Sequence, residues 1–361
     1  TAYEIYMGDW SSTCALPIYL FTPESFRQRL LGVTPAERSI AVLPFQNIGA
    51  DPKEDYLSDG LTEDLLQSLG RLPGVDVTAR SSAFVFRKRD QDVRDIARKL
   101  GVRYVLDGSV RRERDRLRVN AQLIDATTGF ARWSESYDRP FADVLRVQED
   151  ISRSVARSLA VILSRDTSQR LARRAGRDPE AFDAYLQGRY FWNERSAESL
   201  RRAAQYFEVA IERDPDFAPA HVALAELDVV MPLYGVDSPD VAFPRAREQA
   251  LRALQLDDAM AEARATLAVV LYQHDWDWKG AEREFRKAIA LNPSYATARQ
   301  WYAEYLSYAG RFEEAEAEMR AARVLDPLSP TITTLSGSPA LWSRRYADCQ
   351  KQLYGDRKSV V

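Results

Sequence analysis

The chain has 361 residues, a hydrophobic fraction of 45%, a charged fraction of 29% and a formal net charge of −3. This length suits two or three domains, and the composition is ordinary for a soluble globular protein. The small net charge gives no basic field that would draw the chain to nucleic acid, and the absence of a run of about 18 apolar residues argues against a membrane span. The only cysteines and histidines are Cys14, Cys349, His221 and His274, which are too scattered in the sequence for a metal site or a disulfide framework.

The two ends of the chain differ from the rest. Residues 7–18 read MGDWSSTCALPI and the last six read DRKSVV, and both resemble translated sequencing-library adapter. We therefore expect residues 1–20 and 356–361 to be artefacts and the chain to be a fragment of a longer protein. Residues 21–37 contain Pro23 and Pro35 and are expected to form a linker.

Residues 38–163 are predicted to form an α/β domain. Apolar runs or alternation predict strands at 39–45, 75–78, 103–110, 117–124 and 131–137. Leucines at three- and four-residue spacing predict a helix over 55–72, and similar periodicity predicts helices over 91–100 and 141–163. This order favours a mixed sheet with helices on one face, an α+β architecture.

Several segments of this domain carry a family resemblance. SIAVLPF, YLSDGLTEDL, VTARSSAF, DIARKLGVRYVLDGSVRR and LIDATTG follow one another in order. Together they resemble the TolB amino-terminal-like (FlgO-like) domain. The resemblance implies a non-catalytic module of bacterial regulators, which sits between an upstream output domain and downstream tetratricopeptide repeats.

The second half of the chain repeats one pattern of a small residue, a large residue, a small residue and then a proline. Three copies keep the same internal spacing, and the last two prolines, Pro293 and Pro327, are 34 residues apart. The three copies are Ala203, Phe207, Ala210 and Pro215; Ala281, Phe285, Ala288 and Pro293; and Ala315, Met319, Ala322 and Pro327. A period of 34 with these residue types resembles the tetratricopeptide repeat (TPR), which implies an all-α superhelical solenoid.

A degenerate copy between the first two contains the loop MPLYGVDSPD, so four repeats are expected over 179–335 after a linker at 164–178. A partial fifth repeat over 336–355 is expected to be interrupted at Ser336-Gly337-Ser338-Pro339. Aligning the copies predicts which side chains face the inner groove of the solenoid. These candidate partner-binding residues are Trp192, Arg195, Glu226, Gln273, Gln300 and Glu304, and the alternative for each is ordinary solvated helix surface.

Patterns typical of enzymes are missing. The sequence has no Gly-rich phosphate loop, no G-x-S-x-G elbow and no kinase motif, so we predict no catalytic, cofactor-binding or metal-binding residues. The segment QHDWDW at 273–278 is better explained as a packed turn between helices than as a site. The basic stretches at 87–99 and 111–118 are interleaved with acids, which favours a solvated surface over nucleic-acid binding.

The sequence therefore predicts a non-catalytic interaction module whose groove binds a protein or peptide, with self-association as a further option. The helix at 141–163 and the basic stretch at 164–177 are expected to couple the two domains. One interpretation is the regulatory part of a bacterial signalling protein whose output domain lies upstream; by resemblance, this would be a nucleotide cyclase, a Ser/Thr kinase or a winged-helix domain. The other is a free-standing adaptor or envelope assembly protein. The cytoplasm is favoured over the periplasm.

Overall fold

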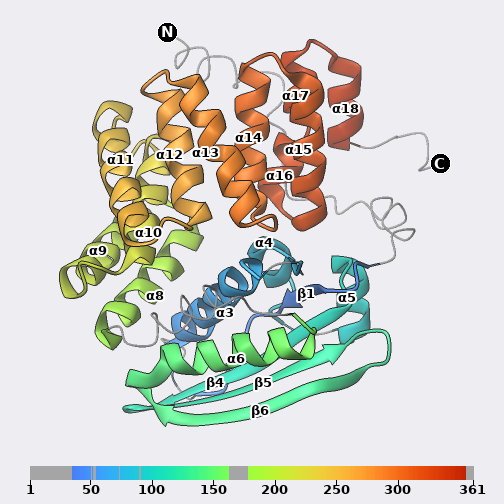
Figure 1. Ribbon diagram of the computed structural model, residues 1–361, viewed down its shortest axis with the longest axis vertical. Helices are drawn as coiled ribbons and strands as arrows, with labels where there is room; N and C mark the ends of the chain where they lie inside the picture. Colours follow the sequence, from blue (N-terminus) through green and yellow to red (C-terminus); the bar gives the residue numbers. More distant parts are fainter. Residues whose placement is uncertain are drawn as a thin grey trace.

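The computed structural model describes residues 35–354, apart from 50, 52–53, 73, 89–90 and 162–177. The predicted artefacts at 1–20 and 356–361 lie outside these residues, as do the two predicted linkers except for residues 35–37 and Asp178. An α/β module is followed by a stack of antiparallel helix pairs (Figure 1). The predicted fold class, a mixed sheet with helices followed by a helical solenoid, is confirmed. None of the described helices is long and apolar enough to cross a membrane.

The sheet of the α/β module combines parallel and antiparallel pairing. Its main path runs β3 (Asp76–Val77), β1 (Ser39–Val42), β4 (Tyr104–Glu113), β5 (Arg116–Asp125) and β6 (Phe130–Pro140), and β2 (Gln46–Asn47) also pairs with β4. Strand β1 is parallel to both β3 and β4, whereas β4, β5 and β6 form an antiparallel meander. The long strand β6 therefore lies at an edge of the sheet.

Helices cover both faces of this sheet, so the prediction that they lie on one face was wrong. Helices α3 (Asp55–Gly70) and α6 (Val144–Ser158), the latter preceded by η3 (Phe141–Asp143), share one core with the alternate residues Leu117, Val119 and Leu123 of β5. Helix α5 (Val93–Leu100) packs with Ala41 and Val105 on the opposite face. The physical reason is that β1 is buried at every residue, as parallel strands are when both faces are covered.

Over the part of the chain that the structure describes, the solenoid has four helix pairs with the packing expected of TPR repeats. The pairs are α8 (Pro179–Glu194) with α9 (Ala197–Arg213), α10 (Ala218–Val230) with α11 (Pro239–Leu256), α12 (Ala261–Gln273) with α13 (Trp278–Leu291), and α14 (Ala296–Tyr308) with α15 (Phe312–Leu325). The large repeat residues Phe207 and Phe285 are fully buried. A Cβ at Gly188 would lie 2.4 Å from Phe207 Cε1, so the first pair requires a glycine there.

Two segments of the solenoid depart from regular helix pairs. The connection between α10 and α11 contains η4 (Met231–Tyr234) and Gly235, whose φ is 63°. After α15, the chain forms two short helices, α16 (Pro330–Leu335) and α17 (Ser338–Trp342), followed by α18 (Tyr346–Tyr354). The break between α16 and α17 falls at Ser336 and Gly337. The short elements β2 and α4 (Arg80–Phe84) have no periodic signal in the sequence.

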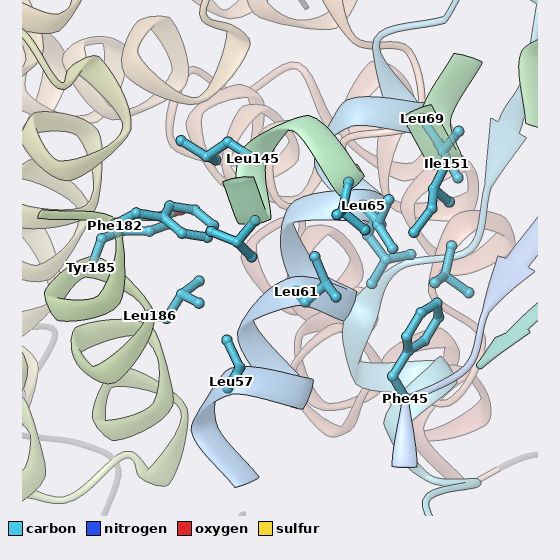
Figure 2. Close-up of a cluster of buried hydrophobic side chains, with 14 of the residues drawn as sticks. Phe45, Leu57, Leu61, Leu65, Leu69, Leu145, Ile151, Phe182, Tyr185 and Leu186 are labelled. Atoms are coloured by element: carbon cyan, nitrogen blue, oxygen red, sulfur yellow. The ribbon is translucent and has the colours of Figure 1, made fainter. Parts of the chain in front are cut away.

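The module and the solenoid share one hydrophobic core. Figure 2 shows leucines of α3 packed between α6 and the side chains of Phe182, Tyr185 and Leu186 on α8. Leu57, Leu61 and Leu186 are at most 1% exposed. Helix α6 belongs to this core, while α3, for which no coupling role was predicted, makes the direct contact with α8. The predicted coupling stretch at 164–177 lies outside the described residues.

The contact between α3 and α8 depends on a glycine. A Cβ at Gly60 would lie 2.6 Å from Leu186 Cδ2 and 3.0 Å from Leu186 Cβ. We predict that Gly60→Ala lowers the free energy of unfolding by about 1–3 kcal/mol, because the helices must move apart. Chemical denaturation measures this. Leu186→Ala removes Cδ2, the atom nearest to the added Cβ, and keeps only Leu186 Cβ at 3.0 Å. The double variant should therefore lose less than the sum of the two single variants, and strict additivity would contradict the clash.

Candidate functional site

The candidate site is the inner face formed by the first helix of each pair. The six predicted residues lie on these helices or at their ends: Trp192 and Arg195 at the end of α8, Glu226 in α10, Gln273 at the end of α12, and Gln300 and Glu304 in α14. Trp192, Glu226 and Gln300 are buried, Glu304 is half-buried, and Arg195 and Gln273 are exposed. The inner face is therefore partly occupied within the chain itself.

Glu226 belongs to a buried ionic network that joins the solenoid to the α/β module. Arg189 on α8 donates from one terminal nitrogen to Glu226 Oε2 at 2.9 Å and from Nε to Glu63 Oε1 on α3 at 2.8 Å. The Tyr295 hydroxyl donates to Glu226 Oε1 at 2.9 Å. Arg80 also contacts Glu63, with Nε 3.1 Å from Oε2. Two arginines and two glutamates thus meet where α3 lies against the inner helices.

Burial and charge oppose each other in this network. Burial raises the pKa of Glu63, but Arg189 and Arg80 outweigh it and hold that pKa below the ordinary value. Burial raises the pKa of Glu226, and the opposing charge of Arg189 does not fully cancel the effect. Arg189 lies between both carboxylates, and its own pKa is raised by them. One guanidinium therefore compensates two buried acids from two structural units.

Further polar contacts fasten the module to the turns between repeats. Arg71 pairs with Glu262 at 3.0 Å, in the first turn of α12. The Ser294 hydroxyl, before α14, accepts from Val77 N at 3.1 Å. Asp326, after α15, accepts from the hydroxyls of Ser81 and Ser82. The module therefore contacts three successive turns along one edge of the solenoid, in addition to α8.

Trp192 and Arg195 form a stacked pair near the end of α8. The Arg195 guanidinium carbon lies 3.8 Å from the centroid of the Trp192 ring, a cation–π contact. Arg195 ends the helix with a left-handed φ of 54°. Arg189 approaches the same ring at 6.0 Å. The structure therefore brings Trp192, Arg195 and Glu226 together around Arg189, a residue that the sequence interpretation missed.

The other predicted residues make separate contacts. Gln300 Nε2 donates to Glu304 Oε1 at 2.9 Å, and burial raises the pKa of Glu304 to about 7. Gln273 Nε2 donates to the Tyr272 hydroxyl at 2.7 Å. Within the described residues, no group of His, Cys, Asp or Glu side chains is arranged to hold a metal ion. The inner face offers charge and hydrogen bonding for recognition, and a partner role for the six residues stays a prediction.

Breaking the network should destabilise the whole chain. We predict that Arg189→Met lowers the free energy of unfolding by about 3–5 kcal/mol at pH 7–8, because Glu226 is left buried without its cation and Glu63 keeps only Arg80. The loss should shrink as the pH falls towards 5, since uncompensated buried carboxyls have raised pKa values and take up protons. Arg213→Met, which removes an exposed ion pair with Glu180, is the control and should cost about 0–1 kcal/mol. Equal losses for both variants would contradict the role of Arg189.

Glu304 should make stability depend on pH near neutrality. Its folded pKa of about 7 exceeds the ordinary 4.5, so the folded state is favoured when the group is protonated, and stability falls as the pH rises from about 4.5 to about 7. We predict that Glu304→Gln is more stable than the wild type by about 1–2 kcal/mol at pH 8, a figure reduced for partial exposure, and equal to it at pH 4. Denaturation curves at both pH values measure this, with the exposed Glu313→Gln as control. A constant offset at both values would contradict the prediction.

Comparison with known proteins finds one family match within the α/β module and relatives that share longer stretches of the chain. Residues 36–152 match the family described as HilA/YgeH-like transcriptional regulator, second domain. The chain is 38% identical over 241 residues to "Putative adenylate cyclase 3" of Rhizobium meliloti, covering 66% of this chain and 40% of that protein. It is 26% identical over 162 residues to "Transcriptional regulator HilA" of Salmonella typhimurium, covering 45% of this chain and 28% of that protein. The chain thus spans less than half the length of each of these relatives.

Solved structures similar to this chain include TPR proteins. TTC0263 of Thermus thermophilus has 18% identity and a TM-score of 0.39, covering 55% of this chain and 97% of its own. YrrB, whose description names an unusual peptide-binding site, has 20% identity and a TM-score of 0.32, covering 49% of this chain and 89% of its own.

Proposed function

We propose that this chain is the regulatory, protein-binding part of a bacterial signalling protein and does not itself catalyse a reaction. The observation that carries this proposal is the buried network of Glu63, Arg189 and Glu226. Because it ties the α/β module to the inner helices of the solenoid, a partner that moves those helices also acts on the module. The exposed Arg195 and Gln273 are the predicted inner-face residues that such a partner would meet first.

The names of the relatives support a regulatory role. One is named an adenylate cyclase and the other a transcriptional regulator, yet both share sequence with this chain. A segment common to proteins with such different outputs is better suited to sensing or coupling than to either output. The TolB amino-terminal-like resemblance of the α/β module agrees with this.

We also propose the division of the chain into a module at 38–163, repeats at 179–335 and a partial repeat at 336–355. The compartment that we propose is the cytoplasm.

The proposal can be tested on the gene. We expect the uninterrupted gene, read from its source DNA, to encode a cyclase, kinase or winged-helix domain upstream of Ser39. Such a domain is the output that a regulatory segment needs. A start codon or a signal peptide immediately before Ser39 would contradict the proposal and leave a free-standing binding protein.

Partner binding can be tested separately in the full-length protein. A photo-crosslinking amino acid at Gln273, on the inner face, is expected to capture a discrete partner in cells of the source bacterium. The same amino acid at Glu248, an exposed position on the second helix of its pair, is the control. Identical products at both positions would mean that the inner face has no special role.

A further inference from the structure

A cleft of about 850 Å³ lies at the junction of the α/β module and the first repeat. One wall is the tip of the β4–β5 hairpin together with η3, and the other is formed by α8 and α9. Clefts of this size between structural units are the usual place for small ligands. The buried network of the inner face does not contribute to its lining.

Apolar side chains form part of the cleft lining. Phe141 lies under the Arg112 guanidinium, whose carbon is 3.9 Å from the ring centroid. Val209 on α9 is 43% exposed, and Pro140 and Pro179 also line the cleft. An aromatic or aliphatic group of a ligand can therefore bury surface here without a large rearrangement.

Most polar groups in the cleft have partners within the chain. Asp183 Oδ1 accepts from the Tyr56 hydroxyl at 2.7 Å and from Arg112 at 3.2 Å, and Oδ2 accepts from Gln187 at 2.9 Å. The pair of Arg213 and Glu180 is exposed on both sides, so it is weak and either group can exchange its partner for a ligand.

The hairpin tip adds charges of both signs. Arg114 and Asp115 form the turn between β4 and β5, and both are exposed. Arg114 has a left-handed φ of 57°, a conformation that favours glycine, yet the position carries an arginine. Counted over its lining, the cleft has Arg112, Arg114 and Arg213 against Asp115, Asp178, Glu180 and Asp183. Such a balance does not attract a polyanion, but it complements a ligand that carries both charges.

We propose that this cleft binds a zwitterionic ligand with an apolar body, of the class of amino acids and short peptides. The ligand's carboxylate pairs with Arg114 and Arg213, and its ammonium group pairs with Asp115 and Glu180. Its apolar group packs on the exposed Val209 and on the lining prolines Pro140 and Pro179. Because the walls belong to both units, the bound ligand holds the module and the solenoid together. This site is independent of the protein-binding role proposed above.

The test uses the chain as it stands, with three probes in isothermal titration calorimetry and saturation-transfer NMR. The probes are L-phenylalanine, a tripeptide with a central phenylalanine, and N-acetyl-phenylalanine amide, which lacks both charges. We expect saturable binding of at least one zwitterionic probe and about tenfold weaker binding of the blocked probe. Tight binding of only L-phenylalanine indicates that the natural ligand is a free amino acid, and tight binding of only the tripeptide indicates that it is a short peptide.

Two matched variants decide whether the cleft is the binding site. Arg114→Gly removes the guanidinium and relieves the left-handed backbone, so it should fold as stably as the wild type and bind about tenfold more weakly. Arg344→Gly makes the same backbone change at a φ of 60° away from the cleft and should leave binding unchanged. Absence of saturable binding by all probes, or equal binding by the wild type and Arg114→Gly, would overturn the proposal.

Discussion

The architecture depends on the burial of one positive charge, that of Arg189, between two acids from different units. A guanidinium removed from water is tolerated only where carboxylates surround it with good geometry, and Glu63 and Glu226 provide this. Glu63 comes from α3 and Glu226 from α10, so the charges are compensated only while α3 stays docked. The leucines of α3 supply the attraction for docking, and the ionic network restricts it to one arrangement.

This arrangement reduces the part of the inner face that is open to partners. In a solenoid each repeat normally contacts only its neighbours, and its inner face is open to partners. Here the inner face near α8 and α10 holds a helix of the same chain, and the polar turns at Glu262, Ser294 and Asp326 hold other parts of the module. The module and the repeats are therefore expected to unfold together, and a signal at one should reach the other.

The sequence predicts the parts of this structure that depend on local periodicity. The spacing of Ala203, Phe207 and Ala210 recurs in later repeats, because the two helices of each pair pack in the same way. The alternation of Leu117, Val119 and Leu123 with polar residues identifies a half-buried strand. The docking of α3 on α8 leaves no such signal. Arg189 and Glu63 are 126 residues apart, and Gly60 looks like an ordinary interruption of a helix until Leu186 is placed against it. The position of α5 was missed for a related reason, since the uninterrupted apolar run of β1 is the only sign that both faces are covered.

The contacts with three successive turns also have an evolutionary consequence. Tandem arrays commonly gain or lose units by duplication and deletion, because one more unit only lengthens the stack. In this protein, deleting one repeat between α8 and α15 would move Ser294 and Asp326 away from their partners on the module, while α8 stayed in place. Selection for the docked arrangement would therefore fix the number of repeats from the first to the fourth. The number of repeats could then vary only beyond α15.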